Sequence, residues 1–263
     1  MEIIRLRAFA DNYIWGLRHQ GHLAVVDPGD AAPVSAYLKQ SGDRLSAILL
    51  THHHNDHVGG VATLTSALCE GGDITVFGPA AENISGVTHP LHGDEEIEVP
   101  GIGLSLHIIA VPGHTRGHIA YYHPDQLFCG DTLFPLGCGR LFEGTPDQMW
   151  HSLSTLAALP GDTQVYCAHE YTHMNLPFAL EVEPGNPQLK ARAETLKAHI
   201  DAHHPTVPMT LADEIATNVF LRPDSPEVIE AAKAHSGNPH LQSPVGVFAA
   251  LREWRNTYVA QRP

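Results

Sequence analysis

The sequence predicts an α+β protein whose first two-thirds is rich in β-strands and whose last third is helical. Its 263 residues, 43% of them hydrophobic, are enough for one large domain or for a large and a small one. Before residue 175, short β-rich runs alternate with Gly, Pro, Asp and Asn. Helical patterns follow, so we expect a domain of residues 1–174 and a smaller all-helical domain of residues 175–263.

The predicted strands of the first part end in turns, most of which carry histidine or aspartate. The β-rich runs cover residues 22–30, 46–54, 74–79, 104–114, 118–124, 126–131 and 163–170. Helical patterns lie between them at residues 61–70 and 147–159. The second pattern follows Thr145-Pro146 and has Gln148 in the capping-box position, which predicts a helix start. In the last third, helices are predicted at residues 189–204, 211–216, 225–237 and 244–259.

Composition excludes several classes of protein. The formal charge of −14 disfavours nucleic acid as a partner, because backbone phosphates require a basic face. No apolar run approaches the roughly 18 residues of a membrane span, and the start lacks the pattern of a signal peptide, so we expect a cytoplasmic protein without membrane contact. Cysteines 69, 129, 138 and 167 form no CxxC pair, and we expect reduced, mostly buried thiols.

The stretch THHHNDHVGG places four histidines and an aspartate directly after an apolar run. Clustered imidazoles have little structural use, whereas neutral imidazole is the commonest metal ligand. Residues two apart at a strand end point to one side, which joins His52 and His54. A turn begun at Asp56 sends Asp56 and His57 elsewhere, so one loop can serve two adjacent ions.

Three further donors follow other predicted strands. His114 lies in VPGHTRGH, Asp131 in FCGDT and His169 in VYCAHE. Taken alone, each would more often be a satisfied histidine or a turn aspartate. Next to the histidine cluster they complete two sites. We predict one site of His52, His54 and His114 and another of Asp56, His57 and His169, with Asp131 bridging both.

Other residues of these motifs are predicted to support the ligands. His53 should point away from the ions, and His118 is a support rather than a ligand. A ligating histidine usually has its second nitrogen fixed by a carboxylate or a carbonyl. Asp27, in VVDPGD, is a candidate for that role, although an ordinary turn aspartate fits the same pattern.

The motifs THHHNDHVGG, PGHTRGH, CGDTLF and CAHEYT, in this order, resemble the metallo-β-lactamase superfamily. The phrases FADNYIW, GCGRLFEGT and EPGNP make the chain more similar to its glyoxalase II (hydroxyacylglutathione hydrolase) family. The resemblance runs over nearly the whole chain. It implies an αββα sandwich with the site at one edge, partly covered by a helical C-terminal domain. It also implies two divalent metal ions, with zinc expected first and iron or manganese as alternatives.

The resemblance also implies residues that contact glutathione. Arg140 stands where many members have lysine, and either cation can meet the glycine carboxylate. Phe142 stands where some members have tyrosine, so a hydroxyl contact is missing, whereas Tyr171 matches. ALREWRNTY resembles a segment that supplies two basic contacts, here Arg252 and Arg255. These two arginines are three apart, so one helical face can present both. A solvated surface of a terminal helix is the alternative.

The implied activity is hydrolysis of S-D-lactoylglutathione and related S-2-hydroxyacylglutathiones, the second step of methylglyoxal detoxification. In that hypothesis a hydroxide bridges the two ions and attacks the thioester, and Asp56 both binds metal and orients the nucleophile. We expect a small-molecule thioester substrate and a monomer. The chain has no GxSxG motif for a serine nucleophile.

Several other functions fit parts of the pattern. A persulfide dioxygenase would share the first metal set but use a single iron and oxygen. A lactonase or a phosphodiesterase fits the metal motif but not the helical C-terminal segment with Arg252 and Arg255. A β-lactamase would normally be exported. A metal-storage or metal-sensing protein would also be rich in histidine, although storage sites tend to be closed.

Overall fold

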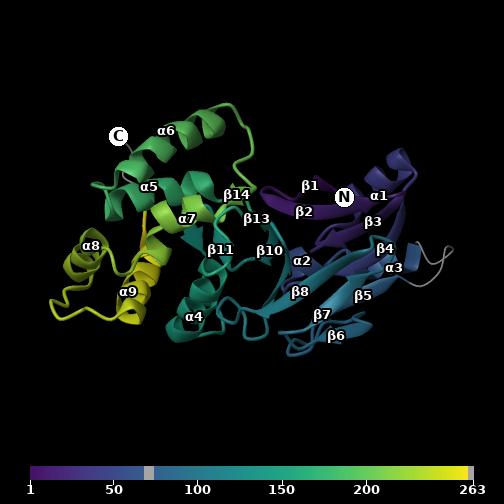
Figure 1. The fold of residues 1–263 in the computed structure, drawn as a ribbon, viewed down its shortest axis with the longest axis horizontal. Coiled ribbons are helices and arrows are strands. Elements are labelled where there is room, and N and C mark those ends of the chain that lie inside the picture. The colour runs from purple at the N-terminus through teal and green to yellow at the C-terminus, as the bar shows by residue number, and fades with distance from the viewer. Residues whose placement is uncertain (68–73, 260–263) are drawn as a thin grey trace.

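The computed structural model describes residues 1–67 and 74–259, and the first part of the chain forms a sandwich of two sheets (Figure 1). The first sheet has the strand order β1-β2-β3-β4-β5-β6. Its strands are β1 (Glu2–Ala8), β2 (Asn12–His19), β3 (His22–Val26), β4 (Arg44–Leu49), β5 (Thr75–Pro79) and β6 (His89–Leu91). β1, β2 and β3 are antiparallel, whereas β3, β4, β5 and β6 are parallel.

The inner strands of this sheet are buried on both faces, which explains their nearly continuous apolar sequences. In β3, Leu23 and Val25 face one apolar cluster while Ala24 and Val26 face the other. The first of these clusters also holds side chains of α1 (Ala31–Ser41) and α3 (Val61–Ala67). These two helices therefore cover the outer face of the first sheet.

The second sheet has the order β14-β13-β10-β9-β8-β7. Its strands are β7 (Glu96–Val99), β8 (Leu104–Ala110), β9 (Ile119–His123), β10 (Gln126–Gly130), β13 (Gln164–Cys167) and β14 (Met209–Thr210). A separate hairpin of β11 (Leu133–Phe134) and β12 (Gly137–Cys138) follows β10. Helix α4 (Pro146–Ala157) adds Met149, Leu153 and Leu156 to the apolar cluster that also contains the side chains between the sheets.

The last third of the chain is helical and gathers at the end of the molecule away from β1–β6 (Figure 1). It consists of α5 (Thr172–Val182), α6 (Pro187–Asp201), α7 (Leu211–Thr217), the short 3-10 helix η2 (Val219–Leu221), α8 (Pro226–Ser236) and α9 (Pro244–Thr257). β14 reaches back from this part and pairs with β13 of the second sheet.

The predicted α+β class and the αββα sandwich are confirmed. The capping box at Thr145 is present, with Thr145 Oγ1 accepting from the Gln148 backbone N–H. Helix α3 occupies the start of the pattern predicted over residues 61–70, and residues 68–70 lie outside the described residues. The division at 174/175 stays a prediction, and α5 crosses it.

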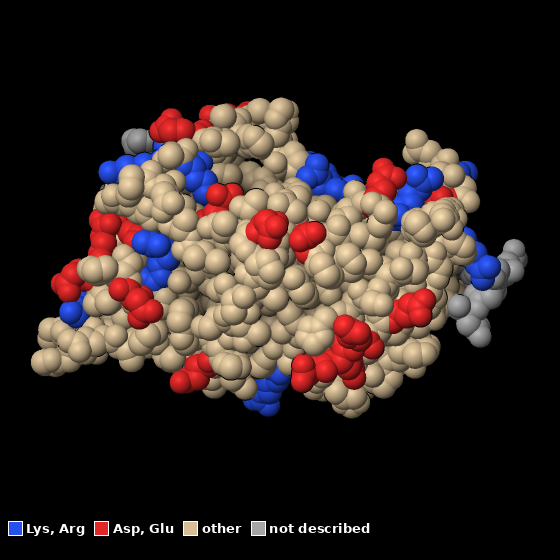
Figure 2. Space-filling model, viewed as in Figure 1, with Lys and Arg blue, Asp and Glu red and all other residues tan. Residues whose placement is uncertain are grey.

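The charge and thiol expectations can be compared with the described residues. On the face drawn in Figure 2, acidic and basic side chains are interspersed rather than gathered into a basic stripe. Cys129, Cys138 and Cys167 are free and buried, as predicted, and Cys69 lies outside the described residues. Among the described helices, none combines the length and apolar character that a membrane span requires.

Candidate metal centre

All seven predicted metal donors lie in loops that follow the carboxyl ends of four strands. Residues 52–57 follow β4 and run into the short helix α2 (Asn55–Val58), and His114 follows β8. Asp131 follows β10 directly, and His169 follows β13. Because β4 and β10 lie in different sheets, the sandwich brings the four loops together at one edge.

The first donor group is His52, His54 and His114. Nε2 of His52 lies 3.1 Å from Nδ1 of His54, and Nε2 of His114 lies 3.0 Å from the same atom. Three imidazole nitrogens thus converge on one point. One ring nitrogen from each of these residues lies within 4.8 Å of the others, which is a spacing that suits a shared ion.

The second donor group is Asp56, His57 and His169. Nε2 of His57 lies 3.6 Å from Oδ2 of Asp56, and Nε2 of His169 lies 3.4 Å from that same oxygen. Asp131 lies between the groups. Its Oδ1 is 3.5 Å from Nε2 of His57 and its Oδ2 is 3.4 Å from Nε2 of His114.

Two buried atoms of this cluster lack hydrogen-bond partners within the described part of the chain. They are Nε2 of His57 and Oδ1 of Asp131. A buried polar atom without a partner is costly, and an ion between these donors would satisfy both. The mixture of imidazole nitrogen and carboxylate oxygen is also the ligand set of zinc and neighbouring metals. The residues present therefore fit two divalent ions.

Outer partners fix the orientation of the ligands. Asp27 lies 3.0 Å from Nδ1 of His57 and accepts from the Thr51 hydroxyl at 2.7 Å, which are the contacts that its predicted supporting role requires. Nδ1 of His169 lies 3.0 Å from Asp11 Oδ1. Asn12 donates to Oδ2 of Asp56 at 3.1 Å. Nδ1 of His114 instead faces the Arg140 carbonyl at 2.8 Å.

His118 supports the centre from behind, as the sequence predicts. It is buried, and its Nε2 accepts from the Asp131 backbone N–H at 3.2 Å. Gly130 precedes Asp131 and has a φ of +50°, and a Cβ there would lie 2.4 Å from the Thr51 hydroxyl. Only glycine allows the chain to turn this closely past the metal loop and point Asp131 inward.

The two donor groups differ in their proton affinities. Burial lowers the pKa of His52 well below its ordinary value and also lowers the pKa of His54 and of His114, so these rings are neutral. Burial lowers the pKa of His57 too, but the carboxylates of Asp131 and Asp27 outweigh it and raise that pKa to about 10. An ion in the second donor group would displace protons that these carboxylates attract.

A cavity of about 550 Å³ opens over the donors. Its lining holds Asp131 and residues from both donor groups, together with Phe134, Arg140, Phe142 and Tyr171. Arg140 and Phe142 are exposed, and the Arg140 guanidinium lies 5.4 Å from the Phe142 ring centre. The Tyr171 ring stacks on His169 with 4.6 Å between the centroids. Three of the five predicted substrate contacts therefore share one cavity with the metal donors.

Comparisons with known proteins cover both parts of the chain. The family described as the metallo-beta-lactamase superfamily matches residues 11–169, and the hydroxyacylglutathione hydrolase C-terminus matches residues 170–258. A hydroxyacylglutathione hydrolase of Alkalilimnicola ehrlichii is 55% identical over 257 residues, covering 97% of this chain and 98% of its own. Another, of Dechloromonas aromatica, is 51% identical over 270 residues and covers 98% and 100%. The chain belongs to the hydroxyacylglutathione hydrolase family.

Solved structures share the fold of this hydroxyacylglutathione hydrolase family member. ETHE1 from Myxococcus xanthus superposes with a TM-score of 0.65 at 23% identity, covering 97% of this chain and 98% of its own. TTHA1623, solved in a di-iron-bound form, gives a TM-score of 0.53 at 28% identity over 64% of this chain and 92% of its own.

The two arginines predicted in the family's C-terminal segment lie outside the lining of that cavity. Arg252 is buried, donates to the Cys138 carbonyl at 2.8 Å and lies 5.1 Å from the Phe220 ring centre. Arg255 is less buried and donates to Asn175 Oδ1 at 3.3 Å. Arg252 thus joins α9 to the β11–β12 hairpin, and its contact with substrate stays a prediction.

Three residues near the centre were missed by sequence reasoning. Asp11 and Asn12 lie in FADNYIW, a phrase noted only for its resemblance, although an Asp-Asn pair at a strand start is a readable signal. Glu82 carries no local signal, because its partners are distant in sequence. His53, predicted to point away from the ions, faces Glu82 and Glu143, at 2.8 Å and 3.3 Å.

Proposed function

We propose that the protein hydrolyses S-2-hydroxyacylglutathiones, with S-D-lactoylglutathione as the principal substrate, to the 2-hydroxy acid and glutathione. This is the second step of methylglyoxal detoxification. The observation that carries the proposal is the convergence of seven donors at one edge of the sandwich, beneath a cavity that also holds Arg140 and Tyr171. Family relatives that match nearly the whole chain, including its helical part, support the same substrate.

The residues that would hold the two ions are the first donor group for one and the second donor group for the other, with Asp131 shared. When bound, two such ions lower the pKa of a water molecule from 15.7 towards about 7 and polarise the carbonyl to be attacked. Zinc is our first choice, since three neutral imidazoles suit it. Iron and manganese remain the alternatives, and the di-iron form of the solved relative TTHA1623 supports iron.

Asp56 is the residue best placed to orient the attacking water. Its side chain is 43% exposed and lines the cavity, whereas Asp131 is buried. The Asn12 amide holds Oδ2 of Asp56, which leaves Oδ1 to accept a hydrogen bond from water. The hydrogen bond with His169 and the charge of the nearby His57 ring keep the pKa of the Asp56 carboxyl below its ordinary value, so it is an acceptor at neutral pH.

The leaving group does not require a general acid. Cleavage of the C–S bond releases the thiolate of glutathione, whose thiol has an ordinary pKa of about 8.5. A thiolate of this kind departs with little protonation. The mechanism therefore needs a positioned nucleophile and a polarised carbonyl but no acid residue on the leaving-group side.

Cations near the cavity would hold the glutathione part of the substrate. The protein is strongly acidic, so an anionic substrate requires local positive charge. Arg140 lies at the rim of the cavity and suits the glycine carboxylate. Tyr171 and Phe142 offer ring surfaces beside it, and we keep Arg252 and Arg255 as proposed contacts from α9. A monomer in the cytoplasm stays a prediction from the sequence.

The proposal is tested by a steady-state assay of S-D-lactoylglutathione hydrolysis, run beside elemental analysis of the same sample. We expect D-lactate and glutathione to form at equal rates in protein that holds two metal ions per chain. A persulfide dioxygenase would instead consume oxygen with glutathione persulfide and hold one iron. Oxygen uptake with that substrate, together with inactivity on the thioester, would contradict the proposal.

A further inference from the structure

Glu82 is a buried carboxylate that belongs to no donor group and lies in the loop after β5. Its side chain is only 3% exposed. The loop is turned by a hydrogen bond from the Glu82 N–H to the Pro79 carbonyl at 3.2 Å and by one from the Ile84 N–H to the Glu82 carbonyl at 2.9 Å. The mechanism proposed above makes no use of Glu82, and burying a carboxylate is costly unless its oxygens are hydrogen-bonded.

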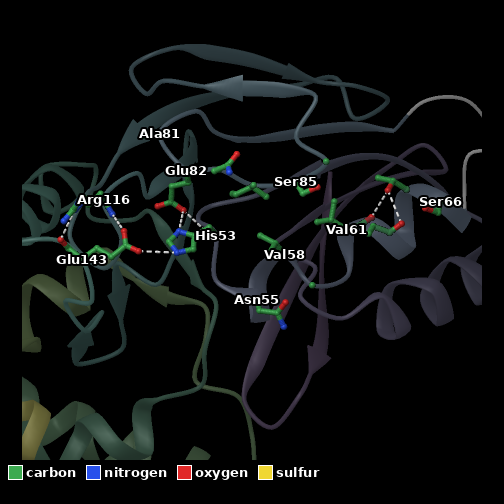
Figure 3. Close-up of a pocket in the computed structure, with 16 residues that line it drawn as sticks. His53, Asn55, Val58, Val61, Ser66, Ala81, Glu82, Ser85, Arg116 and Glu143 are labelled. Carbon is green, nitrogen blue, oxygen red and sulfur yellow. Dashed lines mark hydrogen bonds and ion pairs between the residues drawn. The ribbon is translucent and has the colours of Figure 1, made fainter.

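Both oxygens of Glu82 accept hydrogen bonds from two different loops. Oε2 accepts from the His53 backbone N–H at 2.5 Å and lies 2.8 Å from Nδ1 of the same residue. Oε1 accepts from the Gly117 backbone N–H at 3.1 Å and from the Thr115 hydroxyl. Figure 3 shows Glu82 pointing at His53 from one side while Glu143 approaches from the other.

The partners of Glu82 are neighbours of the first donor group in the chain. His53 stands between His52 and His54, and Thr115 directly follows His114. One carboxylate therefore ties together the only two loops that supply the first donor group. Charge-assisted hydrogen bonds to backbone N–H groups are short and strong, so they fix the loops and not merely the side chains.

The sequence of the His114 loop is adapted to this contact. A Cβ on Gly117 would lie 2.5 Å from Cγ of Glu82, so a larger residue would push the loop away. The glycine in PGHTRGH thus permits the close approach that its backbone N–H needs in order to reach Oε1.

The second donor group has its own partners within the described residues. His57 contacts Asp27, Asp56 contacts Asn12, and His169 contacts Asp11. None of these contacts involves Glu82. Loss of the Glu82 carboxylate should therefore disturb the first donor group and leave the second in place.

We propose that Glu82 is a positioning residue for one of the two metal sites, the one formed by His52, His54 and His114. It acts by holding the two ligand loops at a fixed separation. The inference rests on the donor assignment made under the proposed function, so its test begins with metal content rather than with turnover. The effect of an outer partner on metal affinity is typically about 10–100-fold.

The test compares Glu82→Ala and Glu82→Gln with the wild type and with Glu143→Ala. Glu143 is a matched control because it also contacts His53 and lines the same cavity of about 730 Å³. Its side chain is 35% exposed and it does not receive the His53 backbone N–H. Each protein is loaded with Mn²⁺, and its ions are counted by elemental analysis, titrated for affinity and examined by electron paramagnetic resonance.

We expect the wild type and Glu143→Ala to bind two ions that give the signal of a coupled pair. Glu82→Ala should retain one tight ion with the signal of an isolated Mn²⁺, and its second ion should bind about 10–100-fold more weakly. Glu82→Gln keeps one acceptor oxygen and the original shape, so its loss should be smaller. When the proteins are loaded with zinc, kcat should fall most in Glu82→Ala and less in Glu82→Gln, while KM stays within about twofold of the wild-type value.

Two results would overturn the inference. One is a coupled pair of wild-type affinity in both Glu82 variants, and the other is an equal weakening of both ions in Glu82→Gln. If Glu82→Ala fails to fold, Glu82→Gln decides alone, since it preserves volume. A wild-type protein that binds fewer than two ions would instead refute the donor assignment on which the role of Glu82 rests.

Discussion

The first donor group and the second donor group are held in place by different kinds of partner. In the first, Nδ1 of His52 faces the Thr51 hydroxyl at 3.0 Å and Nδ1 of His114 faces a backbone carbonyl. In the second, both imidazoles face carboxylates, which are those of Asp27 and Asp11. The rings of His52 and His114 are thus oriented by neutral groups, whereas the rings of His57 and His169 are oriented by anionic ones.

This difference has a consequence for metal binding. A carboxylate behind an imidazole makes the ring a stronger donor and adds negative charge to the site. The second donor group also contains Asp56, so an ion there would be surrounded by more anionic charge. We infer that the second ion is held more tightly and that carboxylate-preferring metals such as manganese enter there first.

The largest effect is expected from Asp131→Ala, which abolishes the asymmetry by removing the residue shared by both groups. Metal content and activity should fall together, and kcat/KM should drop by more than the roughly 100-fold that loss of an outer partner costs. Elemental analysis and the thioester assay measure both quantities. Asp162→Ala, an exposed acid elsewhere on the surface, is the control and should match the wild type. Full metal content in Asp131→Ala would contradict a shared ligand.

The convergence of the seven donors could be predicted because their signal is local. Four of the seven lie within six consecutive residues, 52–57, and the others each follow a short apolar strand. Asp27 and His118 were also predicted as supports, but the outer partners Asp11, Asn12 and Glu82 were not, because they contact residues that lie far away along the chain. Asp11 is 158 positions from His169, and Glu82 is 29 positions from His53. Pairings of this kind are made by the packing of the two sheets, which no local pattern records.

Elements such as β2 and α5 were not predicted from the sequence, and both omissions have a physical reason. β2 is buried along most of its length, so it lacks the alternation of polar and apolar residues by which an exposed strand is recognised. α5 contains Pro177 and buries residues around most of its circumference, which removes the amphipathic pattern of a surface helix. Buried strands such as β3 and β10 were nevertheless predicted, because each is a continuous apolar run that ends in a turn.

Asp27→Asn should weaken the second ion more than the first, because Asp27 contacts His57 directly but reaches His52 only through the Thr51 hydroxyl. This is the converse of the effect expected for Glu82 variants. Asparagine has nearly the same shape, but it removes the negative charge behind His57. We expect a loss of about 10–100-fold in affinity for one ion. Zinc titration with a competing chelator measures it. Equal affinity losses at both sites would show that the two groups are not supported independently.

Arg255→Ala should leave both donor groups intact and affect only substrate binding. If Arg255 binds a carboxylate of glutathione, KM should rise by roughly 3- to 10-fold while kcat changes little, because this contact is equally strong in the ground and transition states. Steady-state kinetics at fixed zinc measures both constants. An unchanged KM would remove Arg255 from the proposed contacts.

Arg252→Ala is the comparison for that variant, since Arg252 lies three residues away on the same helix. Its buried guanidinium binds the Cys138 carbonyl, so truncation leaves a buried acceptor unpaired. We expect a loss of about 1–3 kcal/mol in the free energy of unfolding, whatever happens to KM. Arg255→Ala should destabilise the protein less, and a denaturant titration separates the two arginines.

The smallest effect is expected from Phe142→Tyr, which adds a hydroxyl at the rim of the cavity. Phe142 is 59% exposed, so the new group can enter water without strain when no substrate is bound. If the position faces glutathione, one hydrogen bond of about 0.5–1 kcal/mol should lower KM by roughly two- to fivefold, with kcat and the count of two ions unchanged. The ring already lies 5.5 Å from that of His54, so a change in zinc affinity in this variant would mean that the rim and the first donor group are coupled. An unaltered KM would instead place the glutathione chain on the Tyr171 side of the cavity, away from Phe142.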